Sequence, residues 1–130
     1  MAEISGSTDE NRLSITSAST DGIRVLTVRG EIDHDTAPQF QRALILGGDA
    51  TAPRTVLDMR GVTFMDSSGI NTLVAAHQEA AGTQGWVRLA ALAAPVQRVL
   101  EIVGLDAVVA CYPTLGQALD PDSGPAEAAG

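Results

Sequence analysis

Residues Thr55–Gly82 read TVLDMRGVTFMDSSGINTLVAAHQEAAG and decide the fold, because they predict a strand followed by a helix. The apolar, β-branched start of this stretch, Thr55–Met59, is typical of a buried strand. We expect residues 60–66 to form a crossing loop and a helix to begin near Ser67 or Ser68. One face of that helix carries apolar residues at helical spacing, namely Ile70, Leu73, Val74 and Ala81.

The residues before this stretch predict a hairpin and a helix. Leu13–Ser17 alternates apolar and polar residues, and Ile23–Arg29 is rich in β-branched residues, so both predict strands. The turn sequence at Thr20–Gly22 favours antiparallel pairing between them. We expect Gly30 to end the second strand and a helix to follow as far as about Leu46.

A capping box predicts where that helix begins. Thr36 precedes Gln39 by three residues, and Pro38 is tolerated in a first helical turn. The apolar face of the helix is then made by four residues, Ala37, Phe40, Ala43 and Leu44.

The residues after the stretch predict two more strands, Trp86–Ala91 and Ala107–Tyr112, and a short last helix, Pro113–Leu119. A further helix starts at Ala94, and Gly104 fits its C-terminal cap. Its apolar face holds Val96, Val99, Leu100 and Val103. Strands that alternate with helices predict an α/β fold whose mixed, mostly parallel sheet has about five strands and about four helices.

Composition places one globular domain between two acidic ends. The chain has 130 residues and a net charge of −8. Residues 1–11 and 120–130 hold six of the acidic residues and no basic one. Both ends are polar or rich in small residues, so we expect a disordered lead at 1–11, a domain at 12–119 and a disordered acidic tail at 120–130.

The basic residues exclude several functions, because all eight are arginines and the sequence contains no lysine. A P-loop, a Schiff-base enzyme and a response-regulator receiver each need a lysine. The acidic balance also argues against nucleic acid or an anionic membrane as the main partner.

The remaining composition predicts a protein of the cytoplasm without a metal or cofactor. Cys111 is the single cysteine, so an internal disulfide and a paired-cysteine metal site are both excluded. The polar N-terminus is not a signal peptide, and no apolar run reaches the ~18 residues of a membrane span. Two histidines and scattered acids have no metal-ligand spacing. His77 falls on the predicted second helix, where it is expected at the edge of the core.

The segment with the clearest candidate functional groups is Met65-Asp66-Ser67-Ser68-Gly69, at the start of a predicted helix. One interpretation is structural, since Asp and Ser are common N-cap residues. The other is a phosphoacceptor serine, because a phosphate at a helix start meets unpaired backbone N–H groups and the positive end of the helix dipole. The residues alone leave both interpretations open.

A second acidic loop, Glu31–Asp35, also follows a strand and precedes a helix. Loops at the carboxyl ends of parallel strands gather at one edge of the sheet, where ligands and partners bind. The loop is therefore either a solvated cap, with Asp35 or Thr36 capping the next helix, or part of a binding surface.

A serine hydrolase is the enzyme alternative. Ser67 would be the nucleophile, with His34 and either Asp33 or Asp35 as its partners. The G-x-S-x-G elbow of such enzymes is absent.

Three blocks resemble the STAS-domain anti-sigma factor antagonists. They are Phe64–Gly69 (FMDSSG), Val28–Asp33 (VRGEID) and Val96–Leu105 (VQRVLEIVGL), in the order and at the spacing of the family. The resemblance covers about Leu13 to Leu119. One departure is Gly69-Ile70-Asn71, where the family often has Gly-Leu-Gly.

The resemblance implies a binding module of the STAS fold without catalysis or cofactor. In this family the unphosphorylated antagonist binds a cognate anti-sigma factor, itself a serine kinase, and so frees a sigma factor. The kinase phosphorylates the serine that corresponds to Ser67, and a PP2C-type phosphatase reverses the reaction.

By that resemblance we expect a monomer or weak dimer. The partner surface is expected at Glu31, Asp33, His34, Asp35, Met65, Asp66, Ser68, Gly69 and Asn71. A non-switching STAS scaffold or ligand-binding module is the alternative from the same fold.

Overall fold

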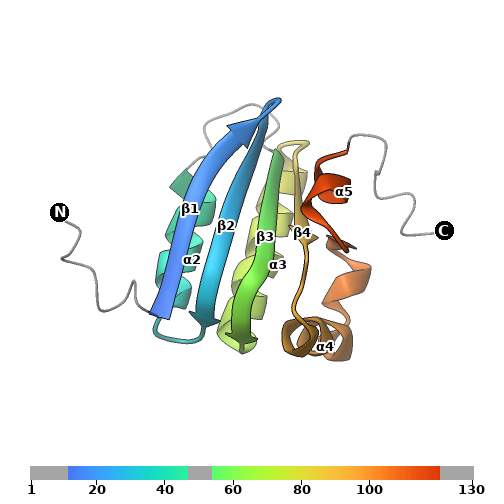
Figure 1. The fold of residues 1–130 in the computed structure, drawn as a ribbon. Helices are drawn as coiled ribbons and strands as arrows, with labels where there is room; N and C mark the ends of the chain where they lie inside the picture. The colour runs from blue at the N-terminus through green and yellow to red at the C-terminus, as the bar shows by residue number, and fades with distance from the viewer. Residues whose placement is uncertain (1–11, 47–53, 121–130) are drawn as a thin grey trace.

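The structure, a computed structural model, describes residues 12–46 and 54–120 and is built on one five-stranded sheet (Figure 1). The strands lie side by side in the order β1-β2-β3-β4-β5. Their bounds are Leu13–Thr20, Ile23–Ile32, Arg54–Met65, Trp86–Ala90 and Ala110–Tyr112. The α-helices of the described residues are α2 (Ala37–Leu46), α3 (Ser67–Gly82), α4 (Ala94–Val103) and α5 (Leu115–Leu119), with a 3₁₀ turn, η2, at Leu105–Ala107.

The sheet is mixed, as predicted. β1 pairs antiparallel with β2, from Leu13 opposite Gly30 to Thr20 opposite Ile23. The turn between them places Asp21 and Gly22 at φ 52° and 81°, which suits the twist of a two-residue hairpin. The pairs β2–β3, β3–β4 and β4–β5 are parallel.

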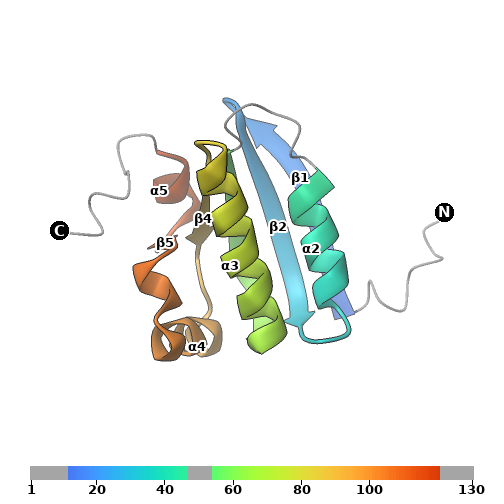
Figure 2. The ribbon, with the colours of Figure 1, turned by 180° about the vertical axis from the view of Figure 1, so that it is seen from behind.

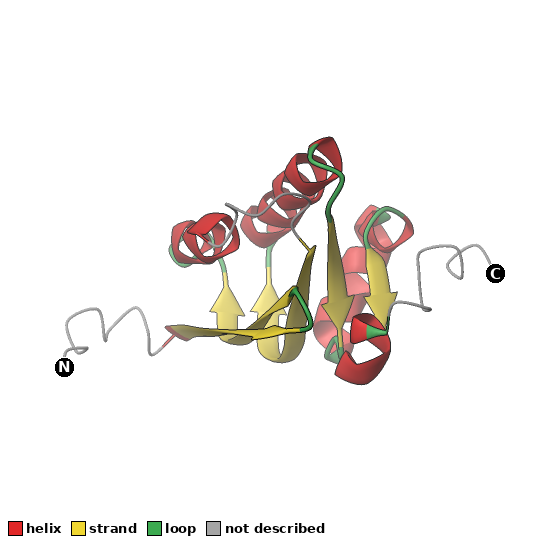
Figure 3. Cartoon of the chain, turned by 90° about the horizontal axis from the view of Figure 1, so that it is seen from above, coloured by secondary structure: helices red, strands yellow, loops and turns green. Residues whose placement is uncertain are grey.

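The helices cover the sheet unevenly. Figure 2 shows α2 and α3 side by side across one face. Among the described residues no helix covers the opposite face over β1 and β2, while α5 packs there against β3, β4 and β5 (Figure 3). Helix α4 lies at the end of the sheet where β2 and β3 finish.

The core follows the same division. The main cluster fills the space between the sheet and α2 and α3, and it includes Phe40, Leu57, Leu73 and Leu89. A smaller cluster lies under α5 and consists of Ile23, Val56, Ala90, Tyr112 and Ala118. Neighbouring residues of β3 point to opposite faces, so Val56 and Leu57 enter different clusters.

Three strands are longer than predicted. β1 runs on from Ser17 to Thr20, and the other two, β2 and β3, together carry the candidate site. β2 continues through Gly30 to Ile32, because Gly30 kinks the strand at φ 111° instead of ending it. A Cβ on Gly30 would lie 1.9 Å from the carbonyl oxygen of Arg12, so only glycine fits. β3 runs on to Met65, so the expected loop at 60–66 is wrong; the apolar Val62 and Met65 are buried in the core.

The predicted capping box of α2 is wrong. The Thr36 hydroxyl accepts a hydrogen bond from Asp33 N at 2.9 Å and donates to the carbonyl of Glu31 at 2.8 Å. The Gln39 amide donates to the carbonyl of Leu13 at 3.0 Å. Both side chains therefore tie α2 to neighbouring segments, where a capping box would join them to each other.

Smaller corrections concern helix faces and the last strand. Ala81 on α3 and Val103 on α4 are exposed, although their spacing predicted burial. β5 is shorter than expected because η2 occupies Leu105–Ala107. Gly104 caps α4 in the left-handed conformation, as predicted. The expected lead at 1–11 and the tail beyond Asp120 lie outside the described residues.

Candidate functional site

The site forms where β2 and β3 end together. Ile32 pairs with Met65 in the parallel register, and Asp66 N donates a hydrogen bond to the carbonyl of Ile32 at 3.1 Å. The two loops singled out by the sequence, Glu31–Asp35 and the segment that follows Met65, therefore lie side by side at the carboxyl ends of β2 and β3. These are the strand ends where open parallel sheets bind their ligands.

Asp66 caps α3 and leaves Ser67 out of the cap. Asp66 has extended backbone at φ −109° and ψ −167°, and its Oδ1 accepts a hydrogen bond from Ser68 N at 2.8 Å. Ser67 is the first residue of the helix, and its side chain is exposed. Within the described part of the chain the Ser67 hydroxyl makes no hydrogen bond, so it is available to a second protein.

Gly69 allows this helix start to pack closely on the sheet. A Cβ at Gly69 would lie 2.6 Å from Cγ of Met65 and 2.8 Å from Cγ2 of Ile32. Met65 and Gly69 were expected at the partner surface, but both are buried. Gly69 belongs to the first turn of α3, and this turn packs directly on Met65 and Ile32, which therefore support the surface from below.

The acidic loop is organised by Asp33. Its Oδ1 accepts hydrogen bonds from Asp35 N at 2.9 Å and from Thr36 N at 3.1 Å. Desolvation acts to raise the pKa of Asp33, but these backbone hydrogen bonds and the charge of Arg12 outweigh it and hold the pKa below its usual value. Asp33 thus shapes the loop that carries the exposed His34 and Asp35.

Arg12 is the residue that sequence reasoning missed. Its guanidinium pairs with Asp33, lies 3.4 Å from Asp35 Oδ2, and is 3.7 Å from Glu31 Oε1. The register of the hairpin could have revealed it, since Leu13 opposite Gly30 places the preceding residue beside the acidic loop. Arg12 gathers three carboxylates at one end of the sheet and offsets part of their charge.

In residues 12–46 and 54–120 the structure does not pair Ser67 with a histidine, as a serine hydrolase requires. Among the described residues no hydrogen bond joins His34 to Ser67, and the second histidine, His77, lies nearly three helical turns beyond Ser67 on α3. A general base must lie within ~3 Å of the hydroxyl that it activates. The candidate site has no such pair.

The same part of the chain offers no metal cluster and no membrane span. Within residues 12–46 and 54–120, no three His, Cys, Asp or Glu side chains are grouped so as to hold a metal ion. In those same ranges no helix is both long and apolar enough to cross a membrane. Cys111 is partly buried, and desolvation together with the charge of Asp106 raises the pKa of its thiol to about 11.

The model of the STAS domain family matches residues 14–118. The chain belongs to the STAS domain family. This STAS domain is 31% identical over 109 residues to the anti-sigma-F factor antagonist RsfB of Mycobacterium tuberculosis, and the match covers 82% of this chain and 87% of RsfB.

Solved structures agree with the fold of this STAS domain. An anti-sigma factor antagonist from Mycobacterium paratuberculosis superimposes with a TM-score of 0.75 at 31% identity, covering 82% of this chain and 91% of that one. The Bacillus cell fate determinant SpoIIAA in its phosphorylated form has a TM-score of 0.62 at 22% identity, covering 82% of this chain and 97% of that one. At 22% identity, the similarity to SpoIIAA shows only that the two proteins share a fold.

The predicted site residues fall into two groups. Glu31, His34, Asp35, Ser67 and Asn71 are exposed at or next to the carboxyl ends of β2 and β3. Asp33, Asp66 and Ser68 are half-buried and hold the two loops in place. The STAS domain therefore has an acidic surface around one exposed serine, built on a buried support.

Proposed function

We propose that this protein is an anti-sigma factor antagonist that is switched by phosphorylation of Ser67. The unphosphorylated form binds a cognate anti-sigma factor, which is also the kinase, and thereby frees a sigma factor in the cytoplasm. A PP2C-type phosphatase restores the binding form. Two relatives that share 31% identity with this chain are described as anti-sigma factor antagonists, which supports the partner class.

The observation that carries the proposal is the exposed Ser67 hydroxyl beside the cap of Asp66. A kinase needs a hydroxyl that is accessible and not committed to the fold. Because Asp66 already satisfies the N–H of Ser68, modification of Ser67 breaks no hydrogen bond of the described structure.

The helix start also tolerates the product of the reaction. The N–H groups of a first helical turn lack partners within the helix, and the helix dipole adds roughly half a positive charge there. A phosphate on Ser67 brings a charge of about −2 to a surface that already carries Glu31, Asp35 and Asp66. The fold of SpoIIAA, whose phosphorylated form has been solved, is the same as that of this chain. A phosphate is thus compatible with the fold while changing the charge that a partner meets.

A kinase assay followed by phosphopeptide mapping tests the acceptor. The purified chain is incubated with ATP and the candidate anti-sigma factor kinase of its own host. We expect one phosphate, on Ser67, which Ser67→Ala abolishes and the neighbouring Ser68→Ala keeps. Incorporation at Ser68, or equal labelling of the Ser67→Ala variant, would contradict the assignment.

A further inference from the structure

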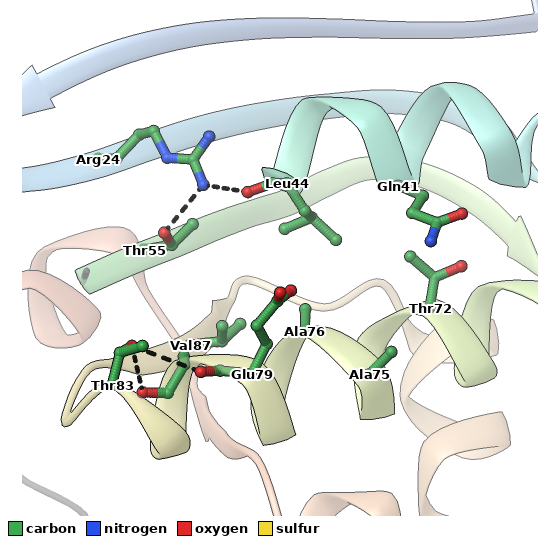
Figure 4. Close-up of a pocket in the computed structure, with 11 residues that line it drawn as sticks. Arg24, Gln41, Leu44, Thr55, Thr72, Ala75, Ala76, Glu79, Thr83 and Val87 are labelled. Carbon is green, nitrogen blue, oxygen red and sulfur yellow. Dashed lines mark hydrogen bonds between the residues drawn. The ribbon is translucent and has the colours of Figure 1, made fainter. Parts of the chain in front are cut away.

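A groove opens between α2 and α3, away from the Ser67 surface, and nothing in the proposed function uses it (Figure 4). It has a volume of about 200 Å³. Ligand pockets of drug-sized molecules hold roughly 300–1,000 Å³, so this groove suits a smaller molecule, near the size of an amino acid.

Small side chains on α3 create the space. Ala75, Ala76 and Ala80 line the groove, and none of them has a side chain longer than a methyl group. Figure 4 shows Ala75 and Ala76 on α3, across from α2. Leu44 and Val87 form its apolar floor, and both are buried. An apolar floor with a few polar groups around it is the usual character of a small-molecule site.

Arg24 supplies a positive charge at one end of the groove. It donates to the carbonyls of Ala43 at 2.7 Å and Leu44 at 2.5 Å, and to Oγ1 of Thr55 at 3.3 Å. A guanidinium has five N–H groups, and the hydrogen bonds of Arg24 to described residues do not use all of them. The others can donate to a ligand. Burial lowers the pKa of Arg24, because a cation there is poorly hydrated, and a bound carboxylate would compensate for the lost water.

Glu79 supplies a negative charge within the same groove. Its side chain rises from α3 toward α2 (Figure 4). In the described ranges it makes no side-chain hydrogen bond and no ion pair. The groove therefore presents one cation and one anion along an apolar floor, which is complementary to a molecule that carries both charges.

We propose that the α2–α3 groove binds a small zwitterion of the amino acid class, with its carboxylate toward Arg24 and its ammonium group toward Glu79. This inference does not depend on the proposed function, and its failure would leave the Ser67 switch untouched.

The side chain of Thr72 connects the groove to the first turn of α3, which carries Ser67. Thr72 lines the groove, and its hydroxyl donates to the carbonyl of Ser68 at 3.0 Å. A ligand that contacts Thr72 is thus one hydrogen bond away from the first turn of α3.

Titration of the ¹⁵N-labelled full chain followed by NMR tests the site. The probes are 4-aminobutanoate, 5-aminopentanoate and 6-aminohexanoate at constant ionic strength, with butanoate and butylamine as single-charge controls. We expect saturable shifts of the Leu44, Thr72, Ala76 and Glu79 amides with at least one zwitterion. The absence of saturable shifts with all three, or equal affinity for a single-charge control, would overturn the proposal.

Matched variants locate the binding. Loss of a hydrogen bond to a charged group predicts that Glu79→Gln weakens zwitterion affinity by about tenfold. Ala76→Leu should remove binding because it fills the groove, while circular dichroism checks that the helices are intact. Glu101→Gln, on the exposed side of α4, should keep the wild-type affinity. Unchanged affinity in both groove variants would place the ligand elsewhere and contradict the proposal.

Discussion

At the start of α3 two adjacent residues have different roles: one caps the helix and the other is exposed to solvent. Asp66 accepts the hydrogen bond from Ser68 N, and Ser67 presents its hydroxyl to solvent. The sequence DSSG alone allowed either serine or the aspartate to cap the helix. Only the backbone conformation of Asp66 distinguishes the capping residue from the residue that is free for chemistry.

This difference in role predicts unequal effects on stability. Asp66→Ala removes the cap and should lower the free energy of unfolding by about 1 kcal/mol. Ser67→Ala removes an exposed hydroxyl and should change it by less than about 0.5 kcal/mol. Urea denaturation followed by Trp86 fluorescence measures both. An equal loss in the two variants would mean that Ser67 has a structural role.

The pKa of Asp33 predicts a pH dependence. Its folded-state value lies below the ordinary value of 3.8, so its contribution to stability is complete above that pH and is lost as the pH falls through the folded pKa. Asp33→Asn keeps an acceptor oxygen for the backbone but loses the charge, so it should flatten the acid limb of the stability curve. Thermal melts from about pH 2 to pH 5 measure this, with Asp21→Asn on the hairpin turn as control. Identical acid limbs in wild type and Asp33→Asn would contradict the assignment.

At the scale of elements, α3 can begin where it does because its first turn rests on the ends of β2 and β3. Gly69 permits this close approach to Ile32 and Met65. The packing places Ser67 at the edge of the sheet and keeps it exposed. The position of Ser67, the proposed phosphoacceptor, therefore depends on a glycine two residues away.

Two glycines of α3 form a matched test of this packing. A Cβ at Gly69 would clash with Met65 and Ile32, so Gly69→Ala should destabilise the fold by about 1–3 kcal/mol. A Cβ at Gly82 meets nothing within 4 Å, and Gly82→Ala should stabilise the fold by about 0.4–1 kcal/mol. Differential scanning calorimetry reports both changes. If the two variants shifted the melting temperature in the same direction, the proposed packing of α3 would be wrong.

The order of the elements could be predicted from the sequence because each has its own pattern. The hairpin turn, the apolar strands and the glycine after α4 were all readable locally. The lengths of β2 and β3 were not, because Gly30 was expected to end β2 and residues 60–66 were expected to form a crossing loop. A glycine also permits a strand to kink, and only the neighbouring strand decides between the two outcomes.

Only part of the site could be predicted, because some of its contacts join residues that are far apart in the sequence. Exposed residues such as His34 and Asn71 could be placed from the loops and the helix that carry them. The ion pairs of Arg12 reach Glu31, Asp33 and Asp35, about twenty positions along the chain, so no local pattern contains them. Arg88 is a comparable case: it is buried, stacks on Trp86 with 3.9 Å to the ring centroid, and holds the carbonyl of Ala118 at the end of α5.

At the scale of the whole molecule, the proposed phosphorylation of Ser67 would act through local charge. Attraction of a phosphate to the start of α3 is worth about 0.3–1 kcal/mol, and repulsion from exposed carboxylates is of similar size and opposite sign. The net change in stability is then small, and the backbone stays nearly unmoved. A partner would meet the added charge on an otherwise unchanged surface that includes Glu31, Asp35 and Asn71.

Calorimetric titration of the host's anti-sigma factor kinase with Ser67 variants tests this claim most directly. Ser67→Ala should bind like the wild type, because it leaves the surface charge unchanged. Ser67→Asp puts a carboxylate where the proposed partner meets a neutral hydroxyl and should bind about tenfold or more weakly, since burying a charge without a partner at an interface costs several kcal/mol. Ser14→Asp, an exposed serine on β1, adds the same charge elsewhere and should keep the wild-type affinity. Equal affinity of the Ser67→Ala and Ser67→Asp variants would contradict the phosphorylation switch and favour a scaffold that binds its partner regardless of Ser67.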